Sequence, residues 1–253
     1  MSEAGIAGRV ALVTGASSGL GARFARVLAA AGARMVLAAR REDRLLALGA
    51  ELRADGVEAL TVALDVGSND SIAAAAAFVE ERFGPIGILV NNAGISRQAK
   101  LEDVTEADYD AVMATNLKGA FFMAQAAARQ MIAHALDGRI VNIASIAGLR
   151  PLGQLGTYSM SKAAMVQMTR SMAREWGRHG INTNAICPGY IETEISADFV
   201  GTEAGRRLLA SLPRKRMGEP RDLDGLLLLL CSGEPSRFLN GAVIAADDGF
   251  TSM

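Results

Sequence analysis

The sequence predicts a doubly wound α/β fold, in which a parallel sheet is covered by helices on both faces. Short apolar runs rich in Val, Ile and Leu alternate along the chain with Ala-rich stretches of helical character. The apolar runs are continuous, which is typical of strands that are buried on both faces. Half of the 253 residues are hydrophobic and 27 are glycine, so we expect a large core with tight turns.

The predicted elements follow one another in β-α order. Strands are expected at 10–14, 35–39, 59–64, 88–91, 140–144, 182–186 and 242–246. Helices are expected at 24–31, 45–54, 71–83 and 157–178, and the apolar run 226–231 is expected to be a buried helix face. The whole chain, 1–253, is predicted to be one domain, because no linker, low-complexity tract or repeat divides it. The segment at about 190–220 is the least regular, and such insertions usually have a function.

The composition favours small-molecule chemistry. With 26 basic and 27 acidic residues the formal net charge is −1, so no global field attracts nucleic acid or an anionic membrane surface. Cys187, Cys231, His134 and His179 lack the spacing of metal ligands, so neither a disulfide nor a metal site is expected. The sequence also contains no recognisable secretory signal or membrane-spanning run. We therefore expect a soluble protein of the reducing cytoplasm, without nucleic-acid or membrane partners.

A glycine-rich turn follows the first predicted strand and opens a helix. Its sequence is Thr14-Gly15-Ala16-Ser17-Ser18-Gly19-Leu20-Gly21. Glycines let the backbone turn sharply and approach a ligand, and the free N–H groups of a helix N-terminus favour a pyrophosphate. The spacing departs from the general G-x-G-x-x-G dinucleotide fingerprint. These residues alone therefore leave open an ordinary strand-to-helix turn.

Tyr158 and Lys162 are the first candidates for chemistry, because they lie four residues apart on one face of a predicted helix. A phenol titrates near 10 in water, so its use at neutral pH requires a lowered pKa, at a cost of roughly 4 kcal/mol. One cation about 4 Å away supplies on the order of 4 kcal/mol at an effective dielectric near 20. Such pairs also arise by chance on solvated helices. Ser145, thirteen residues before the tyrosine, adds a hydroxyl that can donate to a substrate oxygen.

Together these motifs resemble the short-chain dehydrogenase/reductase family, over 9–249 of the chain. The family's turn has the form Thr-Gly-x-x-x-Gly-x-Gly, and its fourth strand is closed by a motif like Asn91-Asn92-Ala93-Gly94. The resemblance implies a Rossmann-like enzyme that transfers a hydride between nicotinamide C4 and a carbonyl or secondary alcohol. The 3-oxoacyl-[acyl-carrier-protein] reductases are among the members it resembles.

The resemblance also implies a role for each motif residue. Tyr158 would be the general acid and base, and Ser145 would orient the substrate oxygen. Lys162 would lower the pKa of the tyrosine and hold ribose hydroxyls, while Asn116 would maintain a water-linked proton path to the lysine. Asp65, otherwise an ordinary loop or cap carboxylate, would contact the adenine ring. The cofactor-binding residues implied are Gly15, Ser17, Ser18, Gly19, Leu20, Gly21, Asp65, Val66, Asn92, Ala93, Gly94, Tyr158, Lys162, Pro188, Gly189, Ile191 and Thr193.

The predicted cofactor is NADP, in preference to NAD. An acidic residue at the end of the second strand would accept a hydrogen bond from a ribose 2′-OH and favour NAD. Here the second predicted strand runs into Arg40 and Arg41, and a guanidinium can bind a phosphate bidentately. The alternative is that both arginines only solvate a loop.

The substrate is left unassigned beyond a small carbonyl or alcohol. The expected walls of its site are 96–98, 147–155 and the flap at 190–217. A 3-oxoacyl thioester is one alternative, because five basic residues of the flap could attract its carrier, although such a run is more often a solvated or salt-bridged patch. These residues are Arg206, Arg207, Arg214, Lys215 and Arg216. A sugar, a steroid or a simple ketone is also left open.

Two further alternatives concern function and assembly. A non-catalytic NADP-binding regulator could keep the glycine turn, but it would have no reason to keep Asn116, Ser145, Tyr158 and Lys162 together. The resemblance implies a homotetramer, or a homodimer. Its interfaces would be formed by the long helices at about 100–133 and 157–178 and by the C-terminal strand.

Overall fold

The computed structural model describes residues 5–192 and 202–252. Thr193, which the resemblance assigns to the cofactor site, lies outside these residues. The described strands form one parallel sheet in the order β3-β2-β1-β4-β5-β6-β7, which confirms the predicted doubly wound fold. The strands are β1 (Val10–Thr14), β2 (Arg34–Ala39), β3 (Ala59–Ala63), β4 (Ile88–Asn91), β5 (Arg139–Ile143), β6 (Asn182–Pro188) and β7 (Val243–Ala246).

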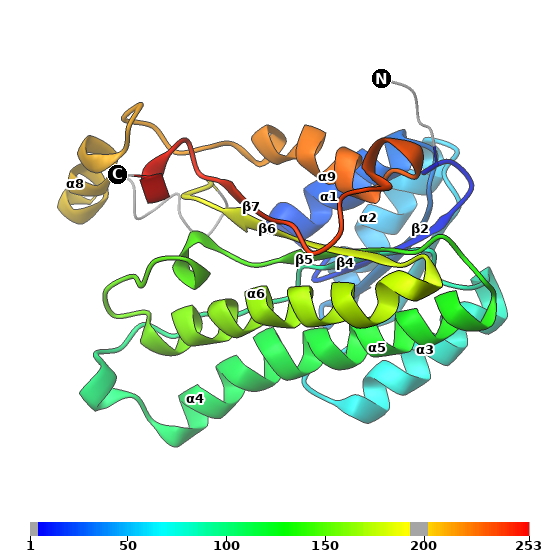
Figure 1. Cartoon of the computed structure of the whole chain (residues 1–253), viewed down its shortest axis with the longest axis horizontal. Coiled ribbons are helices and arrows are strands. Elements are labelled where there is room, and N and C mark those ends of the chain that lie inside the picture. The colour runs from blue at the N-terminus through cyan, green and yellow to red at the C-terminus, as the bar shows by residue number, and fades with distance from the viewer. Residues whose placement is uncertain (1–4, 193–201, 253) are drawn as a thin grey trace.

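Helices cover both faces of the sheet (Figure 1). One face carries α1 (Gly19–Ala30), α2 (Glu42–Ala54) and α9 (Asp224–Cys231). The other carries α3 (Asn69–Phe83), α5 (Ala120–Ala133) and α6 (Gly156–Trp176). α4 (Glu106–Met113) continues into α5 through a π-helical segment, Ala114–Gly119, and α8 (Glu203–Ser211) lies at the end of the molecule that also holds the C-terminus. Short 3₁₀ turns occur at Leu101–Asp103, Ile146–Gly148, Gly177–His179, Pro220–Leu223, Glu234–Ser236 and Phe250–Ser252.

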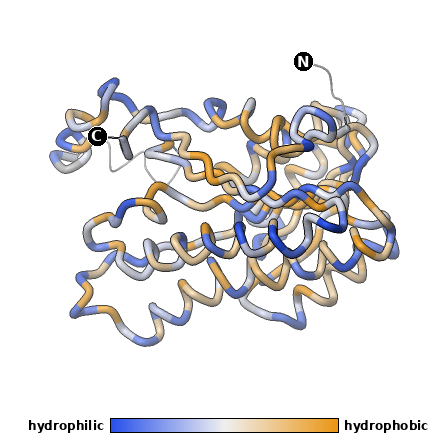
Figure 2. The backbone as a smooth tube through the Cα atoms, viewed as in Figure 1, coloured by the Kyte–Doolittle hydropathy of each residue, from blue (hydrophilic) through white to orange (hydrophobic). Residues whose placement is uncertain are grey.

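The two helical layers explain why the strands are apolar without alternation. Successive side chains of a strand point to opposite faces of the sheet. Leu12 and Leu89 pack into the cluster beneath α3, α5 and α6, whereas their neighbours Val13 and Val90 pack into the cluster beneath α1 and α2. Figure 2 shows the resulting band of hydrophobic backbone through the centre of the molecule, with hydrophilic residues more frequent toward its surface.

Several helices begin earlier than the sequence predicts. α3 starts at Asn69, because the Ser68 hydroxyl accepts a hydrogen bond from Ser71 N at 3.3 Å and so caps the helix. α1 starts within the glycine turn, at Gly19, five residues before the predicted start at 24. The apolar periodicity marks only the buried part of a helix, so polar or glycine-rich first turns are missed.

The segment predicted to be irregular contains a helix. α8 lies within it, and the Thr202 hydroxyl caps this helix by accepting a hydrogen bond from Gly205 N at 3.0 Å. The segment at about 190–220, expected to be the least regular of the chain, therefore includes a regular helix at 203–211. The helix is amphipathic, with Arg206 and Arg207 exposed and Leu208 and Leu209 half-buried, so its pattern was present in the sequence.

A buried arginine ties together the amino ends of the strands, at the edge of the sheet where β1, β4 and β5 begin. The Arg139 guanidinium donates to the carbonyls of Ser232 at 2.7 Å and Gly233 at 3.0 Å, and it pairs with Asp137 at 2.6 Å. Only 1% of the Arg139 side chain is exposed. Arg9 donates to the carbonyl of Gly87 at 2.7 Å in the same region. The turn after α9 is thus bound directly to the central strands.

No helix within 5–192 and 202–252 is long and apolar enough to cross a bilayer. Cys187 and Cys231 are buried and are not bonded to each other.

Candidate active site

The main candidate site is a cleft of about 550 Å³ at the carboxyl ends of the central strands. β1 and β4 are neighbours in the sheet, and the order of strands reverses between them. Ligands of open α/β sheets bind at such a switch point. The cleft is lined by Gly15, Ser17, Ser18, Gly19, Leu20, Ala38, Ala39, Arg40, Arg41, Leu64, Asp65, Val66, Asn92, Ala93, Gly94, Ile95, Thr115 and Tyr158.

The glycine turn has the shape that a dinucleotide requires. Gly15 has φ +68°, and a Cβ there would approach Ala93 Cα to 3.0 Å. Gly21 packs against the carbonyl oxygen of Gly15, so a side chain at Gly21 has no room. Ser18 is the N-cap residue of α1, but its hydroxyl makes no capping bond to the helix. The first N–H groups of α1 are therefore not capped by that side chain, and they fit the phosphates of a nicotinamide dinucleotide.

Thr14 joins the glycine turn to the Asn-Asn-Ala-Gly motif. Its hydroxyl oxygen accepts hydrogen bonds from Asn92 N and from Ala93 N, both at 3.0 Å. The Asn92 side-chain amide donates in return to the Thr14 carbonyl at 3.0 Å. The ends of β1 and β4 are thereby held in a fixed relation, which sets the floor of the cleft.

Arg41 lies across the two serines of the turn. Its guanidinium donates to Ser17 Oγ at 3.0 Å and to Ser18 Oγ at 2.5 Å. The side chains of Arg40 and Arg41 both line the cleft, as the sequence predicts. A cation and two hydroxyls thus meet at the end of β2, where a 2′-phosphate or a 2′-hydroxyl of a bound ribose would lie.

Tyr158 and Ser145 meet at the inner end of the cleft. Ser145 follows β5 and caps the turn Ile146–Gly148, where its hydroxyl accepts from Ala147 N at 3.1 Å. Burial raises the pKa of the Tyr158 phenol, and a hydrogen bond with Ser145 partly opposes this rise. Desolvation therefore prevails in the polypeptide alone, and the expected lowering of the tyrosine pKa by Lys162 together with an oxidised cofactor stays a prediction.

Asn116 holds two segments of the site together. It lies in the π-helical segment and is fully buried. Its side chain accepts from Ile95 N at 2.8 Å and donates to Ile95 O at 2.9 Å. It also donates to Ser161 Oγ at 3.0 Å, and the Ser161 hydroxyl donates to the Tyr158 carbonyl at 2.7 Å. Insertions of this π type often occur at functional sites.

Lys162 is buried beneath the cleft, one turn after Tyr158. Its ammonium donates to the carbonyl of Ile143 at 2.7 Å and lies 5.7 Å from the centre of the Tyr158 ring. Burial lowers the pKa of Lys162 to about 8. Gly94 adjoins both buried groups, since a Cβ there would lie 3.3 Å from Asn116 Oδ1 and 3.6 Å from Lys162 Nζ. Burial of the charged ammonium thus costs free energy of folding, while it holds Lys162 beside Tyr158.

Replacing Lys162 by methionine is expected to stabilise the fold while it removes activity. Lowering the lysine pKa from 10.5 to about 8 corresponds to roughly 3 kcal/mol below pH 8. The lost bond to the Ile143 carbonyl offsets part of this, so we expect a gain of about 1 kcal/mol in the free energy of unfolding at pH 7. Urea denaturation at fixed protein concentration measures it.

The gain should depend on pH with a definite sign. Above pH 8 the folded lysine becomes neutral while the unfolded lysine stays charged, so the stability of the wild type rises between pH 8 and 10.5. The advantage of Lys162→Met should therefore vanish across this range. An advantage that persists unchanged at pH 10.5 would contradict a buried charge as its cause.

The remaining predicted cofactor residues lie in different surroundings. Asp65 lines the cleft, and its carboxylate also accepts from Gly67 N at 2.9 Å, so it stabilises the turn after β3 as well. Gly189 and Ile191 line another cavity, of about 390 Å³, together with Asp247. Pro188 ends β6 beside them.

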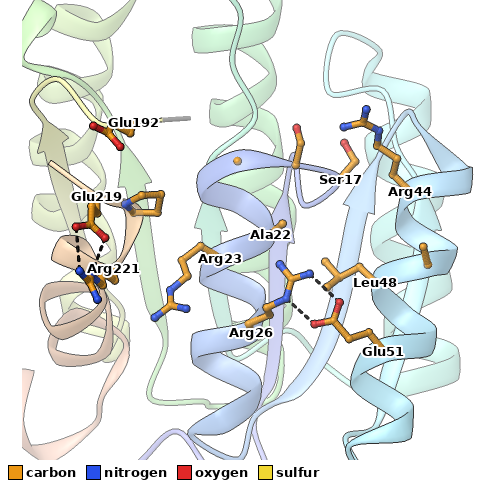
Figure 3. Close-up of a pocket in the computed structure, with 14 residues that line it drawn as sticks. Ser17, Ala22, Arg23, Arg26, Arg44, Leu48, Glu51, Glu192, Glu219 and Arg221 are labelled. Atoms are coloured by element: carbon orange, nitrogen blue, oxygen red, sulfur yellow. Dashed lines mark hydrogen bonds and ion pairs between the residues drawn. The ribbon is translucent and has the colours of Figure 1, made fainter. Parts of the chain in front are cut away.

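A larger cavity of about 1070 Å³ borders the cleft and shares Ser17, Ser18 and Gly19 with it (Figure 3). Figure 3 shows that its charged walls are largely ion paired, with Arg26 on Glu51 and Arg221 on Glu219. None of Asn116, Ser145, Tyr158 and Lys162 lines it. We therefore place the chemistry in the smaller cleft.

Sequence reasoning missed several groups that build the site. These are Thr14 as a clamp, the Ile143 carbonyl that holds Lys162, Ser161, Ile95, and the cleft residues Ala38, Ala39, Leu64 and Thr115. The positions at strand ends could have been found from the fold, because ligands lie at the carboxyl edge of such a sheet. The main-chain partners leave no signal in a sequence.

Comparison with protein families matches residues 9–204 to the short chain dehydrogenases. The chain belongs to this family. A gluconate 5-dehydrogenase of Gluconobacter oxydans is 39% identical over 247 residues, which cover 97% of this chain and 96% of that protein. A sorbitol dehydrogenase of Cereibacter sphaeroides is 38% identical over 237 residues, which cover 90% of this chain and 91% of that protein.

A solved structure of another dehydrogenase is also similar to this chain. A gluconate 5-dehydrogenase from Burkholderia cenocepacia, in complex with NADP and tartrate, superposes with a TM-score of 0.93 at 38% identity, over 98% of this chain and 96% of that one. The short-chain dehydrogenase described here is accordingly an NAD(P)-dependent oxidoreductase of alcohols and ketones.

Proposed function

We propose that this short-chain dehydrogenase uses NADP to interconvert a secondary hydroxyl and a ketone on a hydroxyl-rich carbon chain, with Tyr158 as the proton-transfer group. The observation that carries the proposal is the single cleft in which Tyr158, the glycine turn and Arg41 lie together. The group proposed to transfer the proton and the groups proposed to bind the cofactor phosphates therefore line the same cleft.

In the proposed mechanism each buried group has one task. A bound nicotinamide supplies or accepts the hydride. Ser145 Oγ donates to the substrate oxygen, and the Tyr158 phenol gives that oxygen a proton in reduction or takes it in oxidation. Lys162 would bind ribose hydroxyls of the cofactor through the N–H groups that do not donate to the Ile143 carbonyl. Since burial raises the pKa of Tyr158, the positive charge of the oxidised cofactor must add to that of Lys162 before the phenol can ionise.

The preference for NADP rests on Arg41 and its two serines. Truncating Arg41 to alanine removes the cation that lies on Ser17 and Ser18, and leaves NADH contacts elsewhere in the cleft intact. We expect the Kd of NADPH to rise about 10- to 100-fold and that of NADH to change less than about 3-fold. Fluorescence titration with each nucleotide measures both. Equal weakening of the two would contradict a 2′-phosphate contact.

The names of the relatives support a hydroxyl-rich substrate. Among them are dehydrogenases of gluconate, sorbitol and galactitol, and a dehydrogenase of 2-dehydro-3-deoxy-D-gluconate. Two other relatives are named as a gamma-butyrolactone reductase and as a subunit of a substituted succinyl-CoA dehydrogenase. We infer that polyols and sugar acids are the class to test first. Absorbance at 340 nm with NADP and with NAD, against D-gluconate, D-sorbitol, galactitol and simple secondary alcohols, is the direct assay. Turnover of none of the polyols or sugar acids would refute the proposed substrate class.

A 3-oxoacyl thioester has lost its support in the structure. Three of the five basic residues of the flap that suggested a carrier are paired with carboxylates. Arg207 pairs with Glu203, Arg214 with Asp248 at 3.0 Å, and Arg216 with Asp222 at 3.2 Å. This is the salt-bridged patch that the sequence left as the alternative.

We further propose that the enzyme is a cytoplasmic homotetramer. The outer side of α5 and α6 supports a subunit interface, because a groove of about 800 Å³ there is lined by Phe121, Ile132, Met168 and Trp176. β7 is the last strand of the sheet, and its outer edge faces away from β6. Light scattering of the purified protein, with Phe121→Glu as a variant that charges the groove, tests the assembly. A monomeric wild type would refute it.

A further inference from the structure

We propose that Gln98 and Gln154 form an amide clamp that binds a hydroxyl of the substrate away from the reacting carbon. The proposal rests on the proposed function and deepens it, because it states how a hydroxyl-rich chain is told from a simple alcohol. The two residues come from different walls of the predicted substrate site, and Gln98 Nε2 donates to Gln154 Oε1 at 3.4 Å.

Gln98 extends from a segment that Asn116 fixes. Both main-chain groups of Ile95 are bound by the Asn116 amide, and Ile95 lies three residues before Gln98. Ile95 itself lines the cofactor cleft. Gln98 therefore follows directly on a chain segment that borders the cleft.

Gln154 extends from the loop that leads into α6. It lies four residues before Tyr158, and Ser159 N donates to the Leu155 carbonyl at 2.8 Å, so the loop is locked onto the first turn of the helix. The same loop begins at Ser145, where Arg150 N donates to the Ile146 carbonyl. Gln154 thus belongs to the stretch that joins the two candidate groups for the substrate oxygen.

The two walls are joined by main-chain contacts as well. Ala99 N donates to the Gln154 carbonyl at 3.0 Å, and Ala99 and Leu155 form a parallel bridge. Gln154 has φ +59°, a conformation that is unusual for a residue other than glycine. Strain of this kind is retained where the surrounding structure demands a particular placement. Figure 1 shows the loop before α6 and the segment before α4 at the same end of the molecule.

The chemistry of the pair suits a hydroxyl. Each amide carries two N–H donors and a carbonyl acceptor, and a hydroxyl both donates and accepts. Both side chains are exposed, and among the described residues their only side-chain hydrogen bond is the one between them, which is long. The clamp can therefore exchange this weak contact for two bonds to one substrate hydroxyl, which a monohydric alcohol does not offer.

The test compares two substrates on matched variants of the full enzyme. Gln154→Gly removes the amide but accepts the positive φ, whereas Gln154→Asn keeps an amide and also tolerates it. We expect Gln154→Gly and Gln98→Ala each to lower kcat/KM for the best polyol or sugar acid about 10-fold, mostly through KM. Both variants should leave kcat/KM for 2-hexanol and the Kd of NADPH within about 2-fold. Gln154→Asn should recover part of the loss.

The outcomes separate the clamp from the proposed function. Equal losses on 2-hexanol and on the polyol would assign Gln154 a purely structural role and overturn the clamp, while the proposed function would stand. Turnover of 2-hexanol without turnover of any hydroxyl-rich compound by the wild type would overturn both. A double variant, Gln98→Ala with Gln154→Gly, that loses no more than either single variant would support one shared hydroxyl.

Discussion

Phenylalanine in place of Tyr158 is expected to lower kcat/KM about 1,000-fold or more, for every substrate that the wild type turns over. The substitution keeps the ring beside Lys162 and removes only the hydroxyl that bonds Ser145. Positioned acid-base catalysis contributes roughly 10²- to 10⁴-fold, and the loss also leaves the substrate oxygen with one donor fewer. Steady-state rates at 340 nm measure it.

The Kd of NADPH is the control for the Tyr158→Phe variant. The phosphate-binding turn and Arg41 are unchanged, so Tyr158→Phe should bind NADPH within about 3-fold of the wild type. A variant that binds the cofactor normally and keeps more than a tenth of the activity would exclude Tyr158 as the proton-transfer group. Because burial raises the tyrosine pKa, oxidation by the wild type should also accelerate as the pH rises toward that pKa, and this dependence should disappear in the variant.

The largest effect on stability is expected at Arg139, at the opposite edge of the sheet. Alanine there leaves the carbonyls of Ser232 and Gly233 buried without their donor and opens a cavity where a side chain of 1% exposure was. We expect the free energy of unfolding to fall by about 3 kcal/mol. Urea denaturation measures the change, at a fixed protein concentration because subunit association also stabilises.

Arg237 provides a matched control. Its ion pair with Glu234 joins two side chains that are each more than 70% exposed, and Arg237→Ala should change stability by less than about 0.5 kcal/mol. If Arg139→Ala were no more destabilising than this control, the buried guanidinium would not be what ties the turn after α9 to β5. The kcat of Arg139→Ala should remain near that of the wild type, since the cleft lies at the other ends of the strands.

Most of the fold could be predicted from the sequence, because the buried strands of a parallel sheet are continuous apolar runs. The run at 10–14 is apolar up to its last residue, Thr14, and matches β1 residue for residue. Helix boundaries were harder to predict where a polar cap rather than a buried residue begins the helix. An example is Ser68, whose hydroxyl caps α3. The division of the chain into one domain and the substrate role of the flap stay predictions.

The candidate site was predictable to the extent that it depends on side chains in fixed spacing. Tyr158 and Lys162 stand out by their spacing, whereas Ser145 and Asn116 gained their roles through the family resemblance. Tyr158 lines the cleft, Ser145 bonds Tyr158, and Asn116 holds Ile95, which also lines the cleft. The sequence did not reveal that burial raises the pKa of the Tyr158 phenol in the polypeptide alone. Coulomb's law with an assumed distance omits desolvation, and the depth of Tyr158 is known only once the helices are packed.

The bonds of Asn116 have a consequence for how such an enzyme can change its substrate. One amide holds Ile95 and, through Ser161, the start of α6, so Tyr158 and the base of the proposed substrate wall are built as one unit. If 96–98 and 149–154 form the substrate walls as proposed, mutations there would alter what is recognised without displacing the proposed reacting groups. Substrate specificity could therefore change through single mutations in these walls, each of which leaves an active enzyme.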